Sequence, residues 1–187
     1  MPKTLFLTVA AFLMAACQSQ QHPPLALADA VDIPRFMGDW YVIAAIPTRF
    51  ERLAYNAVES YHYADAGYVD TRFTYNKGAF DGPETTLNAK GYVREDGNGA
   101  VWGMQFVWPF RADYRVMYLS EDYSVTIIGR EARDYLWVMA RTPQLPEDQL
   151  AALLRFCEEQ GYDLSELRMV PQAAGAPPTG AGAAPAG

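Results

Sequence analysis

The stretch from Gly38 to Arg141 is a succession of short apolar-rich segments separated by turn signals, and this pattern constrains the fold most. Clusters of Asp, Gly, Asn and Pro at 65–67, 81–83 and 96–99 favour tight turns. About eight strands with short connections predict an all-β, eight-stranded antiparallel up-and-down barrel that is wide enough for one small ligand. We expect these strands over residues 38–46, 55–63, 67–75, 85–94, 100–108, 113–119, 123–130 and 134–141.

The first expected strand begins with Gly38-Asp39-Trp40-Tyr41 and continues with five apolar residues until Pro47. Glycine lets the backbone pass close to a neighbour, and Trp40 supplies a large ring for the base of a core. An antiparallel strand with one solvated face alternates apolar and polar residues, whereas this strand is apolar on both faces. We therefore expect another element to cover its outer face.

The best helical pattern of the chain follows the last expected strand and predicts that cover. Its apolar residues share the spacing of one helical stripe, at Leu150, Leu153, Leu154 and Cys157. Pro146 suits a first helical position, and Gly161 supplies a stop. Residues 164–170 are expected to return as a short extra strand. The long loop 47–54, and the loops around Asp81, Pro109 and Ala132, are expected at the open mouth of the barrel.

Three blocks of this sequence resemble the lipocalin family, and within it the bacterial lipocalin lipoproteins and their apolipoprotein D-like relatives. The blocks are residues 38–41, 46–52 and 134–143. The resemblance covers roughly residues 31–172 and implies a lipocalin barrel with one C-terminal α-helix packed on the outside. One family block, Thr-Asp-Tyr between the sixth and seventh strands, is degraded here to Leu-Ser-Glu-Asp-Tyr at 119–123. That departure predicts weaker contacts at the closed end.

The N-terminus has the pattern of a secretion signal that ends at a lipidation site. Lys3 precedes an apolar run that is too short to span a bilayer. The run ends with Met14-Ala15-Ala16-Cys17, which resembles the bacterial lipobox, where the cysteine is lipidated and becomes the mature N-terminus. An aspartate directly after the cysteine would resemble a signal for retention in the inner membrane, and this sequence has none there. The resemblance therefore implies sorting to the outer membrane. The alternative is an ordinary signal peptide that is cut after residue 16.

These observations divide the chain into a signal peptide (1–16), a lipidated tether (17–30), a lipocalin barrel domain (31–172) and an Ala/Gly/Pro tail (173–187). The tail lacks periodicity and is predicted to be disordered. The chain has 187 residues, of which 50% are hydrophobic, and this supports one domain. It holds two cysteines. If Cys17 is lipidated, Cys157 has no partner for a disulfide.

The formal net charge of −7 gives the chain no electrostatic reason to bind nucleic acid. Contact with a membrane is therefore expected through lipidated Cys17. No cofactor is expected, and the oligomeric state stays open.

The fifth expected strand presents two alternating faces. The bulkier face holds Trp102, Met104, Phe106 and Trp108. The resemblance implies that this face lines a ligand cavity, and the alternative is a filled core without a cavity.

The resemblance also implies cavity rings at Tyr61 and Trp137. Tyr135 shares the face of Trp137, and Asn76 falls near the rim. Glu59 shares the face of Tyr61, and a carboxylate inside an apolar barrel needs a partner or a raised pKa. We expect Glu59 either to hold the polar head of a ligand or to be turned outward by a local bulge.

A structural set is implied at the base of the barrel. Arg141 matches a family arginine that lies across the ring of the first-strand tryptophan, here Trp40, beside Gly38. A cation over an indole face contributes about 0.5–2 kcal/mol. We interpret this set as structural, without a role in ligand binding.

The sequence offers little for catalysis. His22 lies in the tether, and His62 stands alone on a strand without ligands at metal-binding spacing. No Ser-His-Asp arrangement and no phosphate-binding glycine loop is recognisable. No catalytic or metal site is predicted, and the chain is not expected to be an enzyme.

The resemblance favours an outer-membrane lipoprotein that stores or transports fatty acids or lysophospholipids in its barrel. Two alternatives stay open. One is an enzyme that modifies a lipid or isoprenoid held in the same cavity, with Glu59 at its centre. The other is a filled structural barrel that binds no ligand.

Overall fold

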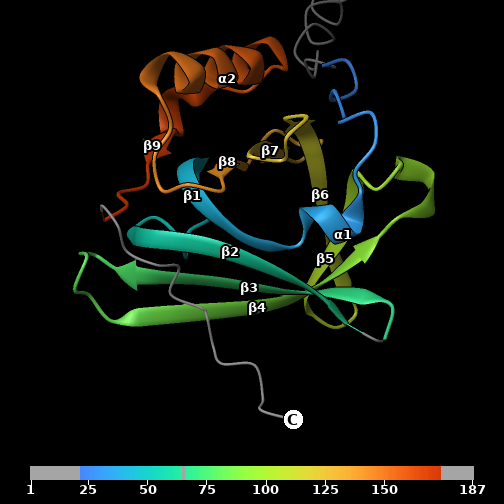
Figure 1. Cartoon of the computed structure of the whole chain (residues 1–187), viewed down its shortest axis with the longest axis horizontal. Helices are drawn as coiled ribbons and strands as arrows, with labels where there is room; N and C mark the ends of the chain where they lie inside the picture. The colour runs from blue at the N-terminus through green and yellow to red at the C-terminus, as the bar shows by residue number, and fades with distance from the viewer. Residues whose placement is uncertain (1–21, 65, 174–187) are drawn as a thin grey trace, which may run out of the picture.

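The computed structural model describes residues 22–64 and 66–173 (Figure 1). The predicted signal peptide, the lipidation site at Cys17 and the tail from residue 174 lie outside this part. The barrel strands are β1 (Gly38–Ile46), β2 (Ala54–Ala64), β3 (Tyr68–Lys77), β4 (Glu84–Val93), β5 (Val101–Val107), β6 (Phe110–Leu119), β7 (Val125–Gly129) and β8 (Leu136–Ala140). The other elements are α1 (Ile33–Phe36), the 3-10 turns Glu95–Gly97 and Leu164–Glu166, α2 (Glu147–Glu159) and β9 (Arg168–Met169).

Each strand pairs antiparallel with the next one in sequence, and β1 pairs with both β2 and β8. This pairing closes the sheet, so the predicted eight-stranded barrel is confirmed. The short strand β9 adds to the outside of β1 through residues 44–45. No helix among the described residues is both long and apolar enough to cross a bilayer.

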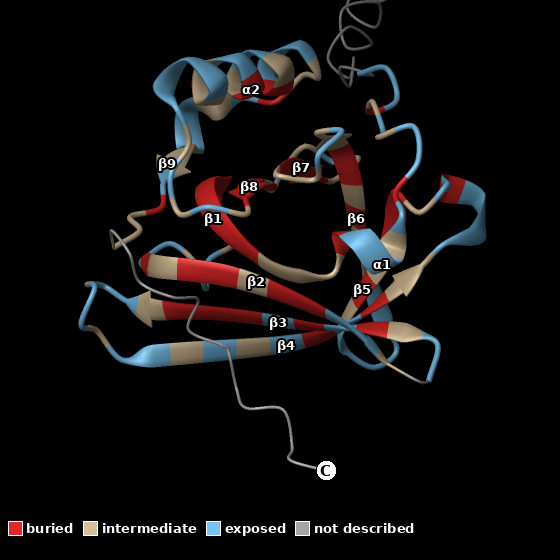
Figure 2. Cartoon of the chain, in the orientation of Figure 1, coloured by how far each residue is buried: buried red, intermediate tan, exposed pale blue. Residues whose placement is uncertain are grey.

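Strand β1 is buried on both faces, as its sequence predicts (Figure 2). Trp40 and Val42 point into the barrel core. Ile43 and Ile46 belong to a second cluster outside the barrel, where Leu153 of α2 is buried against them. The helix therefore covers the outer face of β1. It begins one residue later than predicted, because Pro146 is its N-cap and Glu147 its first residue.

The four-residue helix α1 closes one end of the barrel, and the sequence pattern did not predict it. Its Phe36 is fully buried, with its ring centroid 5.0 Å from that of Trp40 and 5.4 Å from that of Tyr61. Trp40 Nε1 donates a hydrogen bond of 2.9 Å to the carbonyl oxygen of Phe36. We call this end, where β1 begins, the closed end.

The predicted contact between Arg141 and Trp40 is present at the closed end. Arg141 Cζ lies 3.7 Å from the indole centroid. The guanidinium also donates to the carbonyl oxygens of Phe36 and Met37 at 3.0 and 2.9 Å. Gly38 has a φ of +94°, and a Cβ there would stand 3.4 Å from Arg141 Nη1. Arg141 thus joins α1 to the start of β1.

The degraded family block still makes contacts at the closed end. The Tyr123 hydroxyl accepts a hydrogen bond of 2.9 Å from the backbone N–H of Asp32. Arg35 Cζ lies 4.1 Å from the ring centroid of Tyr123. This block therefore holds the N-cap and the last turn of α1.

The opposite end of the barrel is the mouth. In an up-and-down barrel the connections after β1, β3, β5 and β7 all lie at the end away from the start of β1. These connections are residues 47–53, 78–83, 108–109 and 130–135.

Candidate functional site: a cavity open at the mouth

A cavity of about 530 Å³ occupies the mouth half of the barrel. This volume lies within the range of about 300–1,000 Å³ that is usual for small-molecule sites. Its apolar wall includes Phe73, Leu87, Met104, Val107, Ala112 and Met139. The alternative of a filled barrel is therefore wrong for this half. The closed-end half is filled, because Phe36, Trp40 and Trp102 pack together there.

Most of the predicted pocket residues border this cavity. They are Glu59, Tyr61, Met104, Phe106, Tyr135 and Trp137. Their location agrees with a role in binding, and that role itself stays a prediction.

Three predicted pocket residues lie outside the cavity wall, and the predicted wall is corrected at these positions. Trp102 is 1% exposed and belongs to the closed-end core, where its ring centroid lies 5.7 Å from that of Phe36. Trp108 is 81% exposed, in the turn after β5. Asn76 accepts a hydrogen bond from Asn56 Nδ2 and donates one to the carbonyl oxygen of Gly82, each at 3.0 Å.

The error on β5 has a physical reason. The pairing between β5 and β6 shifts register between Met104 and Val107. A β-bulge breaks the simple alternation of faces, so positions beyond it no longer continue the inward series. Phe106 consequently borders the cavity while it is 60% exposed, and Trp108 points away from it.

Glu59 faces the cavity, which decides the question that its sequence left open. It stands opposite Trp40 of β1 and Phe73 of β3, on the inner face of β2. The bulge that could have turned it outward does exist, between Tyr55 and Val58, but it lies before Glu59. Its side chain borders the cavity.

The Glu59 carboxyl is a polar group without a protein partner. Within residues 22–64 and 66–173, no side chain or backbone N–H forms a hydrogen bond or ion pair with it. Burial raises its pKa to about 8, and the nearby charge of Glu51 adds to the rise. At neutral pH most of the carboxyl is therefore protonated, and it can both donate and accept a hydrogen bond.

A second carboxyl, on Glu51, borders the cavity nearer the mouth. Glu51 Oε2 accepts hydrogen bonds from Trp137 Nε1 at 3.1 Å and from the backbone N–H of Thr48 at 3.3 Å. Burial raises the pKa of Glu51, and these hydrogen bonds partly oppose the rise. Glu51 belongs to a block that supports the lipocalin resemblance, but its loop position gave no sign that it would face a cavity.

Two tyrosines on opposite strands lie beside Glu59 at the floor of the cavity. The hydroxyl groups of Tyr61 (β2) and Tyr114 (β6) are hydrogen-bonded to each other. Burial raises the pKa of both well above the ordinary value, and the proximity of Glu59 adds to it. Tyr114 is not among the predicted pocket residues, although its alternation with Val116 on β6 indicates that it faces inward. We call Glu59, Tyr61 and Tyr114 the floor cluster.

The cationic groups of the cavity lie at the mouth. Arg49 Cζ is 4.6 Å from the ring centroid of Phe50. Arg130 Nη1 forms an ion pair of 2.9 Å with Asp134, and its Nε has no hydrogen-bond partner among the described residues. The guanidinium groups therefore lie at the mouth together with the carboxyl groups of Glu51 and Asp113, whereas the floor carries Glu59 and two tyrosines.

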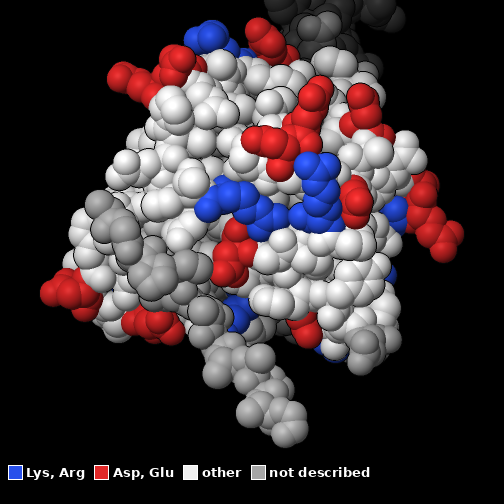
Figure 3. All heavy atoms as spheres, viewed as in Figure 1, with Lys and Arg blue, Asp and Glu red and all other residues white. Residues whose placement is uncertain are grey.

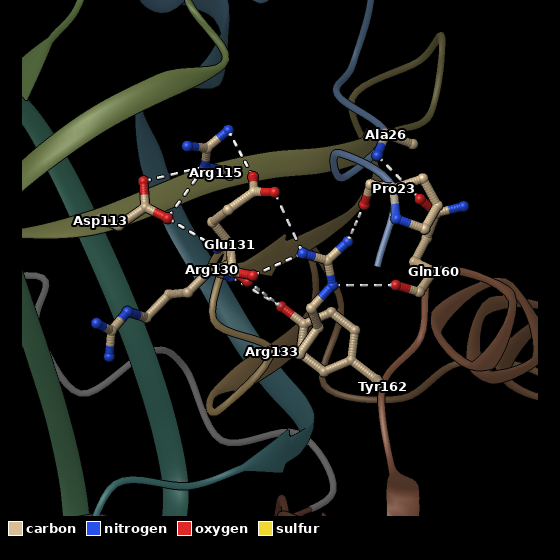
Figure 4. Close-up of polar contacts among 9 residues, drawn as sticks. All are labelled: Pro23, Ala26, Asp113, Arg115, Arg130, Glu131, Arg133, Gln160 and Tyr162. Carbon is tan, nitrogen blue, oxygen red and sulfur yellow. Dashed lines mark hydrogen bonds and ion pairs between the residues drawn. The ribbon is translucent and has the colours of Figure 1, made fainter. Parts of the chain in front are cut away.

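A polar network fixes the β7–β8 turn at the mouth (Figure 4). Glu131 of this turn accepts from Arg115 of β6 at 3.0 Å and from Arg133 at 3.2 Å. Arg133 in turn donates to the carbonyl oxygens of Gln160, after α2, and of Pro23, in the N-terminal segment. The network ties the rim of the cavity to both flanking segments of the chain.

The described residues offer few groups for covalent or metal chemistry. Cys157 is buried on α2 outside the barrel, and burial raises its pKa to about 12. Within the part of the chain that the structure covers, no three His, Cys, Asp or Glu side chains are grouped to hold a metal ion.

On the face shown in Figure 3, basic side chains form a short band with acidic ones on both sides.

Comparison with known proteins gives consistent results. Residues 31–172 match the family model described as the lipocalin-like domain. The chain is 30% identical over 166 residues to the outer membrane lipoprotein Blc of Citrobacter freundii, covering 87% of this chain and 92% of that protein. It is 24% identical over 187 residues to apolipoprotein D of Bos taurus, covering 91% and 95%.

Solved structures share the fold. Insecticyanin from the tobacco hornworm Manduca sexta superimposes with a TM-score of 0.63 at 12% identity, covering 82% of this chain and 87% of that one. Apocrustacyanin C1 superimposes with a TM-score of 0.61 at 12% identity, covering 82% and 93%. At this level of identity the likeness shows the fold alone.

Proposed function

Because this chain belongs to the lipocalin family, we propose that it is a lipid-binding lipoprotein of the outer membrane that stores or transports fatty acids or lysophospholipids in its barrel. Members of the family bind small hydrophobic ligands, and relatives that cover most of this chain are named outer membrane lipoproteins. The choice of single-chain lipids, and the anchor at Cys17, are our proposals beyond that.

The observation that carries this proposal is the shape and lining of the cavity. It is open at one end, about 530 Å³ in volume and walled mainly by aliphatic and aromatic side chains. Such a wall favours an acyl chain, since each buried methylene contributes about 0.8 kcal/mol. Arg49 and Arg130 border the mouth, where a carboxylate or phosphate head would meet them.

We propose a carrier rather than an enzyme. Lipocalin family members are generally ligand-binding carriers. The Glu59 carboxyl forms no hydrogen bond with a nucleophile or a base. Its polar neighbours Tyr61 and Tyr114 are hydrogen-bonded to each other instead. A wall of this composition holds an apolar ligand by area and orients it through few polar groups.

Mass spectrometry of lipids that co-purify with the protein tests this proposal. We expect a single-chain lipid near one molecule per protein. The matched control is Ala112→Trp, which places a large ring into the cavity wall. If the folded control carries the same lipid at the same ratio, or if the native protein carries none, the proposed function is wrong.

A further inference from the structure

We propose that the floor cluster is a binding site for a neutral hydroxyl group on the ligand, so that the preferred lipid is an acyl chain hydroxylated far from its head. This inference rests on the proposed function and names the ligand class of the same cavity. A simple fatty acid with its head at the mouth would present only methylenes and a methyl group to the floor.

The floor of the cavity is polar, whereas its wall is apolar. The wall around Glu59 is apolar, yet its carboxyl has no partner among the described residues. A buried polar group without a hydrogen-bonding partner is destabilising, and an apolar chain end would offer Glu59 none. A ligand that supplies a hydrogen-bonding group at this depth avoids that cost.

The neighbouring hydroxyl groups specify the kind of group. Tyr61 and Tyr114 share one hydrogen bond, which leaves one of their two protons free to donate. The floor therefore offers donors as well as the acceptor oxygens of Glu59. A hydroxyl group both donates and accepts, so it can satisfy the carboxyl and a tyrosine together.

A cationic amine, the other candidate, is disfavoured because its ammonium group, even when paired with Glu59, would have to be desolvated in an apolar cavity. At the mouth, Arg130 is already paired with Asp134, and Glu51 borders the same cavity. Arg49 can bind an anionic head there, which places the far end of the chain at the floor.

The test compares two ligands of equal chain length, hexadecanoic acid and its ω-hydroxylated form, bound to delipidated full-length protein. We expect the hydroxylated acid to bind about tenfold more tightly. Further ω-hydroxy acids of shorter and longer chain locate the length at which the hydroxyl reaches the floor. An equal affinity for both forms at every length would overturn the inference.

Two substitutions at one position identify the chemistry. Glu59→Gln keeps a donor and an acceptor and should retain most of the preference for the hydroxylated acid. Glu59→Leu keeps the volume but removes both, and the preference should disappear while plain hexadecanoic acid binds at least as tightly. A preference for hexadecylamine that Glu59→Gln abolishes would instead show a cationic ligand and overturn the neutral class. Absence of binding by every acid would contradict the proposed function itself.

A second inference comes from the N-terminal segment, independently of the floor. We propose that the mouth of the barrel faces the phospholipid bilayer. Residues 23–31 run along the outside of the barrel from the closed end to the mouth. The backbone N–H of Val31 donates to Asn98 beyond β4 at 2.9 Å, and that of Ala28 donates to Val116 of β6 at 2.9 Å.

Further towards the mouth, the N–H of Ala26 donates to Gln160 at 2.9 Å, and Arg133 binds the carbonyl oxygen of Pro23 (Figure 4). Leu25 lies between Pro23 and Ala26 in the sequence, and it is buried in the second apolar cluster, outside the barrel. Pro23 lies six positions after Cys17 in the sequence, and this stretch of chain spans at most about 21 Å. An acyl anchor on Cys17 therefore holds the mouth end close to the membrane.

The rim of the mouth carries the side chains that a bilayer interface favours. Phe50, Trp108 and Phe110 are 58%, 81% and 76% exposed. Aromatic rings are favourable at the level of lipid head groups, and Arg49 beside Phe50 adds a cation that suits phosphate. The tether makes the bilayer the partner within reach of these exposed rings.

Fluorescence quenching by brominated phospholipids tests this orientation in the lipidated protein on vesicles. The fluorescence of Trp108 should be quenched. Its signal is the difference in fluorescence between the native protein and Trp108→Phe. The matched control is Trp108→Phe with Tyr63→Trp, because Tyr63 is 62% exposed near the closed-end β2–β3 turn. The new tryptophan should not be quenched. Equal quenching at both ends, or quenching at Tyr63→Trp alone, would overturn the proposed orientation.

Discussion

At the scale of single residues, Glu59 is the position where the barrel departs from an apolar design. Burial raises the pKa of Glu59 to about 8 in the folded protein. Between about pH 5 and pH 8, Glu59 is therefore protonated in the folded state and ionised in the unfolded state. The unfolded state thus binds fewer protons in this window. The contribution of Glu59 to stability therefore falls as pH rises and is most unfavourable above pH 8.

Glu59→Gln should remove this dependence. We expect the variant to gain stability relative to the native protein as pH rises, by up to about 5 kcal/mol in alkaline solution. Urea unfolding at a series of pH values measures the difference, which cancels the titration of other groups. A stability difference that stays flat from pH 5 to pH 9 would show that Glu59 has an ordinary pKa.

Trp40 and Arg141 form the other pair whose energetics can be measured residue by residue. Trp40→Ala should cost roughly 3–5 kcal/mol because a fully buried ring is lost. Arg141→Ala should cost about 1–2 kcal/mol through its cation–π contact. Because the two side chains touch, their effects should not add in a double-mutant cycle. Strict additivity of the two free energies of unfolding would argue against an energetic contact.

At the scale of elements, the strands and α2 were predictable because each is long enough to show a recognisable pattern of apolar and polar residues. Helix α1 has only four residues, too few for a periodic signal, so the plug at the closed end was not predicted. The bulge in the β5–β6 pairing depends on contacts between strands, and it misplaced Trp108 for that reason. The inward direction of Glu59 depended likewise on where the β2 bulge falls.

Phe36 tests the importance of α1. Phe36→Ala should cost roughly 3–5 kcal/mol, because the ring fills the space between Trp40, Tyr61 and Trp102. Arg35→Ala, in the same helix, serves as the control, since it removes a surface contact with Tyr123 that should contribute about 0.5–1 kcal/mol. Thermal or urea unfolding measures both. If the two variants lose equal stability, α1 acts through its surface contacts rather than as a plug.

At the scale of the whole molecule, the apolar cavity and the N-terminal anchor have complementary roles. The anchor is tested at Cys17. We expect Cys17→Ser to abolish lipidation and to move the protein from the membrane to the soluble fraction. The mass of the mature protein and its distribution after fractionation report both effects. A variant that stays in the membrane with unchanged mass would contradict the lipoprotein assignment.

The most direct test of the central claim, that the barrel binds single-chain lipids in its cavity, is a titration of delipidated protein with fatty acids of increasing chain length. Trp137 borders the cavity and should report binding by a change in fluorescence that Trp137→Phe removes. Affinity should rise about fourfold per added methylene until the cavity is full, and then level off. Phe106→Ala should weaken binding without unfolding the protein. Folded, lipid-free protein that shows no saturable binding at any chain length would contradict the account.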